Sequence, residues 1–278
     1  FKILSDNVVI NNLTLIGGSH EGEPYDDDGN PTIYTYDIIE IKNANNTLIS
    51  NCIITNASDS GVTSDGGNNT TVDNCTFTHN GGSDGGALNL KTANTLINNS
   101  RFYFNHGGNG GAINVDLPSL RILNCEFLNN TAEARAGAVY VLGANAIIDS
   151  CIFEYNKANA GYGGAAINCE GENATIRNSK FLNNKASYPT LTQNADNPLI
   201  FTLTGENNYI NAIRADHVIK FENVTYWDGT VVTGNDPVKT ENITGIYVTI
   251  DIFKNDILVK KAEVMTNASG QAKYDYYE

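Results

Sequence analysis

The sequence repeats itself with a period of about 25 residues, and such a period constrains the fold more than any isolated segment does. In each copy an aliphatic residue stands three positions before a Cys or Ser, an Asn (once a Ser) stands one position before it, and Ile or Phe stands two positions after it. These Cys and Ser residues, the anchors, are Cys52, Cys75, Ser100, Cys125, Cys151 and Ser179. Because successive anchors are 23, 25, 25, 26 and 28 residues apart, the spacing predicts a solenoid with one copy per coil.

A second, glycine-rich motif recurs between the anchors and leads into another short strand. Its copies are residues 85–88, 110–113, 136–139 and 163–167. Each coil thus offers three short β segments between Gly-rich or Asn-rich bends, without a sustained helical period of 3.6 residues. We therefore expect an all-β fold, a right-handed parallel β-helix of about seven to eight coils with three strands per coil, over residues 1–232.

Stacked coils place equivalent residues in columns, about 4.8 Å apart. The predicted aromatic column consists of Phe77, Phe102, Phe127, Phe153 and Phe181. The predicted aliphatic column consists of Ile49, Val72, Ile97, Ile122, Ile148 and Ile176. The Asn before each anchor suits a sharp bend, because Asn tolerates the left-handed backbone conformation and its amide can bond the next coil.

The repeat weakens after Phe181. Looser copies at residues 210–213 and 221–226 precede the single Trp, Trp227, and we interpret this segment as the closing coil. Period-two alternation at residues 246–253, followed by a second strand at 257–264, predicts a hairpin. This segment resembles the start of a bacterial-type immunoglobulin-like domain, so residues 233–278 are interpreted as part of such a domain.

The pairing of the Gly-Gly-Ala motif with a Phe followed three positions later by Asn resembles the repeats of methanogen adhesin-like surface proteins. More distantly, it is similar to the repeats of the chlamydial polymorphic outer-membrane family. The resemblance covers roughly residues 1–230. It implies a non-catalytic adhesin at the cell surface that attaches to another cell, a host surface or a glycan. The alternatives are a polysaccharide lyase or hydrolase and a structural cell-wall stalk.

The charge of the chain argues against a nucleic-acid or anionic-membrane partner. A formal charge of −14 and a pI near 4.6 disfavour polyanionic partners, which need a basic face. No apolar stretch approaches the roughly 18 to 20 residues of a membrane span, and the first residues lack signal-peptide features. We interpret the chain as a fragment whose secretion signal and anchor lie outside it.

Catalytic residues are not predicted. Glycoside hydrolysis needs two opposed carboxylates, and on a solenoid these should recur at one lateral position of neighbouring coils. The outward positions one after and two before the anchors carry no such pair, and neither a Gly-His-Gly nor an Arg-Ile-Lys triplet occurs. The four His residues fall in bends without a metal-ligand spacing.

The insertion between the first two coils is the candidate binding loop. Carboxylates suit Ca²⁺ and tyrosine rings can stack on sugars or proteins, although a solvated acidic loop explains the same residues and their spacing is not that of an EF-hand. No other cofactor is expected. The candidate residues are Glu21, Glu23, Tyr25, Asp26, Asp27, Asp28, Asn30, Tyr34 and Tyr36.

Twelve Asn-x-Ser/Thr sequons exceed the number expected by chance and favour a glycosylated surface protein. The alternative is that the bends require Asn and that the repeat multiplies the coincidence. The candidate sites are Asn12, Asn45, Asn56, Asn69, Asn74, Asn98, Asn129, Asn173 and Asn223, and Asn68, Asn242 and Asn267 complete the set. The aligned cysteines are interpreted as buried packing residues, with a disulfide between neighbouring coils as the alternative.

Overall fold

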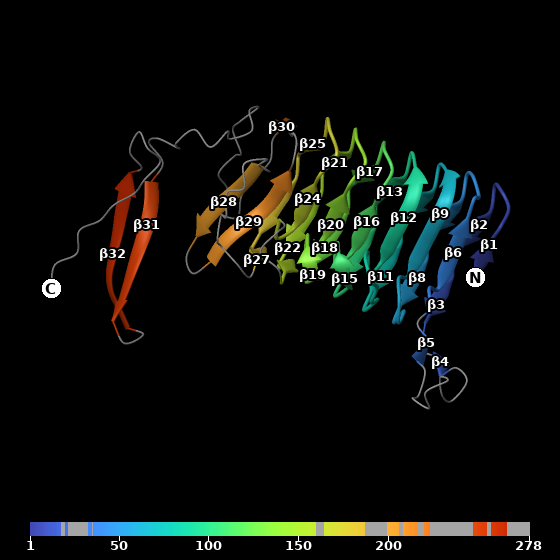
Figure 1. Cartoon of the computed structure of the whole chain (residues 1–278), viewed down its shortest axis with the longest axis horizontal. Helices are drawn as coiled ribbons and strands as arrows, with labels where there is room; N and C mark the ends of the chain where they lie inside the picture. Colours follow the sequence, from blue (N-terminus) through green and yellow to red (C-terminus); the bar gives the residue numbers. More distant parts are fainter. Residues whose placement is uncertain are drawn as a thin grey trace, which may run out of the picture.

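The computed structural model describes residues 1–17, 36–159 and 164–186 with their side chains. Beyond these ranges it describes the strands β4, β5 and β28 to β32 by their backbone. Short strands stack side by side along the long axis, from β1 and β2 near the N-terminus to β24 and β25 (Figure 1). The described part of the chain forms no helix long and apolar enough to cross a bilayer.

Three parallel sheets form the walls of the solenoid. Sheet A consists of β1 (Lys2–Ile3), β6 (Ile39–Lys42), β9 (Val62–Asn68), β12 (Leu88–Ala93), β16 (Ile113–Val115), β20 (Val139–Val141), β24 (Ile167–Cys169) and β29 (Asn208–Ala215), with β28 (Leu199–Gly205) antiparallel at its edge. Sheet B consists of β2 (Val9–Asn11), β7 (Leu48–Ser50), β10 (Thr71–Asp73), β13 (Leu96–Asn98), β17 (Arg121–Leu123), β21 (Ile147–Asp149), β25 (Thr175–Arg177) and β30 (Lys220–Glu222). Sheet C consists of β3 (Thr14–Ile16), β8 (Ile53–Thr55), β11 (Thr76–Thr78), β14 (Arg101–Tyr103), β18 (Glu126–Leu128), β22 (Ile152–Glu154) and β26 (Lys180–Leu182).

A fourth, shorter sheet lies between sheets C and A, and we call it the corner sheet. It consists of β15 (His106–Asn109), β19 (Thr131–Arg135), β23 (Lys157–Ala158) and β27 (Lys185–Ala186). Every coil runs from sheet A to B to C, which confirms the prediction of three main strands per coil. The seven strands of sheet C are joined by six parallel steps. The solenoid therefore makes about six full turns between the first and last strands of sheet C, where the sequence predicts about seven to eight coils.

The predicted columns are in register. Val72 pairs with Ile49 on one side and Ile97 on the other, so the aliphatic column is confirmed. The aromatic column is confirmed by ring stacking, with centroid separations of 5.1, 4.9, 4.7 and 4.9 Å and interplanar angles of 6° or less from Phe77 to Phe181. Both columns are fully buried, and the core they form is continuous along the solenoid.

The anchors do more than fill space. The Cys75 thiol and the Ser100 hydroxyl each donate to the carbonyl oxygen two residues earlier, at 3.3 and 2.8 Å. The same Ser100 oxygen accepts the backbone N–H of Cys75 on the preceding coil at 3.1 Å, and Cys75 sulfur accepts that of Cys52 at 3.4 Å. A small side chain that both donates and accepts satisfies these buried groups, and this explains why Cys and Ser alternate in one column.

Asparagine corners bend the chain between sheets. The residue before each anchor has a positive φ, from +49° to +56°, which confirms the predicted left-handed bend. These residues are Asn51, Asn74, Asn99, Asn124, Ser150 and Asn178. Two further columns of left-handed residues mark the end of sheet A and the end of sheet C. Three such corners per coil account for much of the abundance of Asn in the sequence.

A second set of asparagines lies inside the solenoid, where the sequence pattern places an Asn five residues after the anchor. Asn130 is fully buried and donates from Nδ2 to the carbonyl oxygen of Phe102 at 2.8 Å and to Asn156 Oδ1 at 3.0 Å. Its own Oδ1 accepts both the backbone N–H and the Nδ2 of Asn105 at 3.0 Å. The same contacts link the whole buried ladder, which consists of Asn80, Asn105, Asn130, Asn156 and Asn184.

The looser copies beyond Phe181 continue the stack. β29 pairs in parallel with β24, and β30 pairs in parallel with β25. The predicted hairpin is confirmed as β31 (Tyr247–Lys254) paired antiparallel with β32 (Ile257–Met265). An immunoglobulin-like module is not shown by these two strands. Trp227 lies outside the described residues.

Candidate functional site

The outer face of sheet A carries a column of polar side chains, which we call the polar column. The strand register aligns Thr63, Asn89, Asn114, Tyr140 and Asn168 on successive coils. Their sequence neighbours, such as Ile113 and Val115, belong to the core, so alternation along each strand turns the polar column outward.

Much of this outward face is nevertheless buried. Asn114, Tyr140 and Asn168 expose only 3%, 4% and 0% of their surface. Asn114 Nδ2 donates to Asn89 Oδ1 at 2.9 Å and to Asp116 Oδ1 at 3.0 Å. Within the described part of the chain, however, the Oδ1 atoms of Asn114 and Asn168 have no donor. A buried carbonyl oxygen without a donor is costly, so the packing of the neighbouring coils must offset this cost at both positions.

An ion pair closes one end of the polar column. Arg135, at the end of β19, donates from Nη1 to Tyr140 Oη and to Glu170 Oε1, each at 2.7 Å. Its guanidinium lies over the Tyr140 ring, 5.7 Å from the centroid. Asn168 Nδ2 also donates to Glu170, at 3.2 Å. Burial, together with the hydrogen bond to Glu170, raises the pKa of Tyr140 to about 12, so the phenol stays protonated and able to donate.

The glycine motif of the sequence forms the wall beside the polar column. A Cβ atom at Gly85 would collide with the carbonyl oxygen of Leu88 and lie 2.6 Å from the backbone nitrogen of Asn114. Gly110 has a φ of +71°, and a Cβ there would collide with the carbonyl oxygen of Ile113 and lie 3.2 Å from Tyr140 Cβ. Only glycine lets these turns fold down against sheet A.

The polar column continues toward the insertion. Thr63 donates to Asp37 Oδ2 at 2.6 Å, and Asp37 lies two residues before β6, the second strand of sheet A. Burial raises the pKa of Asp37 from 3.8 to about 6; the Thr63 hydrogen bond opposes this shift, and the charges of Asp59 and Glu40 add to it. The chain thus joins β6 beside the polar column.

Two carboxylates lie along the edge of the polar column. Asp116 and Glu170 occupy the same outward register two coils apart, about 9.6 Å at the usual strand spacing. Glu170 Oε1 forms the ion pair with Arg135 at 2.7 Å and also accepts from Asn168 Nδ2 at 3.2 Å, so this carboxylate is held by side chains of the column itself. Among the described residues, no three His, Cys, Asp or Glu side chains gather to hold a metal ion.

Most of the loop predicted from the sequence lies outside the described residues. Glu21 and Tyr34 belong to a short antiparallel pair, β4 (His20–Glu21) and β5 (Ile33–Tyr34). Tyr36 is 51% exposed, and its backbone N–H donates to Ser58 Oγ at 3.3 Å. The remaining residues, Glu23, Tyr25, Asp26, Asp27, Asp28 and Asn30, and with them the Ca²⁺ hypothesis, fall on the undescribed segment.

The five cysteines are all free thiols and all buried, in agreement with their interpretation as packing residues. Burial raises the pKa of Cys75 to about 12 and that of Cys151 well above its usual range. Such thiols are poor nucleophiles, because reaction requires the thiolate. They belong to the core and not to a site.

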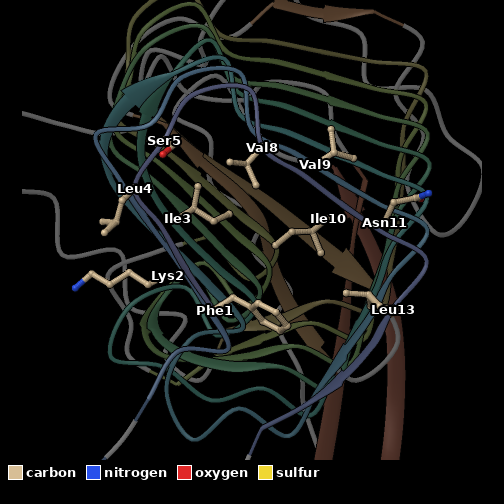
Figure 2. Close-up of a pocket in the computed structure, with 10 residues that line it drawn as sticks. All are labelled: Phe1, Lys2, Ile3, Leu4, Ser5, Val8, Val9, Ile10, Asn11 and Leu13. Atoms are coloured by element: carbon tan, nitrogen blue, oxygen red, sulfur yellow. The ribbon is translucent and has the colours of Figure 1, made fainter.

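The N-terminal end of the solenoid has a hollow of about 540 Å³. Figure 2 shows Ile3 and Ile10 pointing into the interior of the coil, while Lys2 and Leu4 point away from it. The lining is mainly apolar, with few polar groups converging on it. A specific small-molecule site requires such groups, so the hollow is the open end of the core.

Parallel strands in three sheets, in-register core columns and left-handed corners together define a parallel β-helix. The chain belongs to the right-handed β-helix family: the model described as "Right handed beta helix region" matches residues 4–160, more than half of the 278 residues. Neither a curated protein nor a solved structure matches the chain.

The sequence-based search for chemistry missed the polar column. That search considered the outward positions beside the anchors, on sheets B and C, whereas the column lies one residue beyond the glycine motif, on sheet A. Reading the residue after each Gly-Gly-Ala-aliphatic segment would have given Asn89, Asn114, Tyr140 and Asn168. The role of Arg135 could not be read in this way, because it reaches the column from the corner sheet.

Proposed function

We propose that this protein is a non-catalytic binding module that holds a hydroxyl-rich glycan along the outer face of sheet A. The observation that carries the proposal is the polar column, a row of hydrogen-bonding side chains repeated at the coil spacing. The buried members support the row from beneath, and a linear polymer of similar units can contact the partly exposed groups along it, which are Thr63, Asn89, Asp116 and Glu170. Arg135, Tyr140 and Glu170 fix one end of the row.

The hydrogen-bonding groups of the column favour a ligand that donates. Among the partly exposed groups, the carboxylates of Asp116 and Glu170 accept but cannot donate. Asp116 and Glu170 add negative charge, and the whole chain has a formal charge of −14. A neutral polysaccharide, whose hydroxyls both donate and accept, fits this surface better than a polyuronate.

The setting is proposed to be the cell surface. The resemblance of the repeats to adhesin-like proteins supports attachment to another cell, a host surface or a glycan on it. The hairpin β31–β32 is compatible with the first strands of an immunoglobulin-like spacer. A polysaccharide lyase or hydrolase remains the alternative function, since acidic groups also line the column.

Binding is tested with the folded chain and immobilised neutral polysaccharides, beside polygalacturonate as the acidic comparison. The variant Arg135→Ala removes the contacts to Tyr140 and Glu170 and should weaken retention on the neutral polymer several-fold, because these two side chains lose the group that fixes their positions. Arg121→Ala, on the exposed face of sheet B, is the matched control and should leave retention unchanged.

Two results would count against this function. Equal retention of the two arginine variants would show that the glycan does not bind at sheet A. The appearance of new reducing ends or unsaturated products during incubation would replace the binding module by an enzyme.

A further inference from the structure

The structure divides the glycosylation sequons into two groups by what their carboxamides do. Six take part in hydrogen bonds with a neighbouring coil or residue: Asn45, Asn68, Asn69, Asn74, Asn98 and Asn173. Within the described part of the chain, the carboxamides of Asn12, Asn56 and Asn129 make none. In the first group the hydrogen bonds of the carboxamide explain why Asn stands at these positions, without any attached sugar.

Asn129 stands apart within the second group because of its neighbours. It lies at the corner between sheet C and the corner sheet, with a φ of +54°. Phe104 occupies the same corner one coil before it, and Tyr155 one coil after it, with φ values of +54° and +53°. The register is fixed by Phe104 N–H donating to Leu128 O at 3.1 Å and by Asn129 N–H donating to Glu154 O at 3.0 Å.

The two aromatic residues are unusual at this corner. The left-handed conformation is rare and strained for bulky residues, and the same column elsewhere carries Asn56, His79 and Asn183. Phe104 is 49% exposed and Tyr155 is 51% exposed, so neither ring is there to fill the core. Strain that brings two rings to the surface beside a sequon indicates a role outside the core.

The spacing leaves room for a sugar between the rings. Phe104 stacks on His79 at 5.2 Å and 17°, one coil away, so its ring faces look along the solenoid axis. Its second face is therefore turned toward the coil of Asn129. Phe104 and Tyr155 are two coils apart, about 9.6 Å. A sugar ring that contacts an aromatic ring on each side needs those two aromatic rings to lie about 7 to 8 Å apart, because carbon atoms pack at 3.5 to 4.0 Å.

We propose that Asn129 carries an N-linked glycan whose first sugar packs between Phe104 and Tyr155. The donor is a lipid-pyrophosphate-linked oligosaccharide. Asn129 Nδ2 forms a bond to the anomeric carbon, the bond from that carbon to the pyrophosphate oxygen breaks, and the Nδ2 proton passes to the transferring enzyme's base while the lipid pyrophosphate leaves. Thr131 supplies the hydroxyl of the sequon and begins β19. This inference is independent of the proposed glycan-binding face on sheet A.

Site occupancy tests the first part. The 278-residue chain is secreted from cells with an N-glycosylation pathway, and glycopeptide mass spectrometry measures each sequon. Occupancy at Asn129 should be several-fold higher than at Asn74, an exposed sequon of the first group. An unmodified Asn129, or occupancy no higher than at Asn74, overturns the proposal.

Thermal unfolding tests the packing of the sugar. The variant Thr131→Ala removes the sequon but keeps Asn129. Its Tm shift is measured in protein from the glycosylating cells and in protein from a host without the pathway. The decrease in Tm should be a few degrees larger in the protein from the glycosylating cells. In a Phe104→Ala background this difference should vanish. Thr76→Ala, which removes the Asn74 sequon, is the matched control and should show no such difference. A glycan effect that persists without Phe104 would contradict the stacking.

Discussion

Replacing Asn130 by Ala tests whether the buried asparagine ladder holds the coils together. The change leaves the backbone N–H of Asn105 and one Nδ2 hydrogen of Asn105 without the acceptor that both use at 3.0 Å. It also removes a donor from the carbonyl oxygen of Phe102. An orphaned buried polar group costs about 1 to 3 kcal/mol, so the two donors of Asn105 that lose their acceptor predict a destabilisation of roughly 2 to 6 kcal/mol.

The matched control is Asn129→Ala, one residue earlier. Asn129 is less buried and its side chain makes no hydrogen bond within the described residues, so that change should cost only about 1 kcal/mol, for placing Ala in the left-handed region. Both proteins are prepared without glycosylation, and thermal unfolding is followed by far-ultraviolet circular dichroism. At about 2 to 4 °C per kcal/mol, Asn130→Ala should lower Tm by roughly 5 to 20 °C. Equal shifts in the two variants would refute the stabilising role of the ladder.

Two other changes test the aromatic column in the core and Asp37, which lies beside the polar column. Phe127→Ala opens a cavity in the centre of the aromatic column and should cost about 3 to 5 kcal/mol in chemical denaturation, whereas Lys180→Ala on the outer face should cost little; equal midpoints would mean that the strand alternation is inverted. Asp37 has a pKa of about 6 in the fold against 3.8 for an ordinary Asp, so its protonated form favours folding. Its contribution is complete below pH 3.8 and lost as pH rises through 6, and Asp37→Asn should flatten the stability profile over that window. An unchanged profile would show that Asp37 does not titrate there.

The repeat made most of the solenoid predictable, because one side chain per coil reports the position of a whole column. Phe127 and its counterparts recur at the anchor spacing, and only stacking brings them within 5.1 Å of each other. The interior position of Asn130 was not predictable from polarity, since a polar residue normally indicates the surface. It is buried because its neighbours on both coils satisfy every hydrogen-bonding group that it carries.

The candidate site was less predictable for a different reason. The position of Asn114 is set by register, which the glycine motif reveals, but its burial depends on turns contributed by other coils. Arg135 reaches Tyr140 across a corner whose geometry is not periodic, since the pairing of β15 with β19 shifts register there. The acidic insertion has no counterpart in other coils, so the repeat says nothing about its conformation.

The direction of the hydrogen bonds has a mechanical consequence. In a parallel β-helix the bonds between coils run along the long axis, so tension applied along that axis pulls them apart instead of shearing them. The chain leaves an end coil as a single strand, and its bonds then break one after another, starting at the end. Each detached coil of 23 to 28 residues would add roughly 80 to 95 Å of extended chain, at about 3.4 Å per residue. A stretched molecule should therefore yield in regular steps from its ends while the remaining coils keep their register and any surface they display.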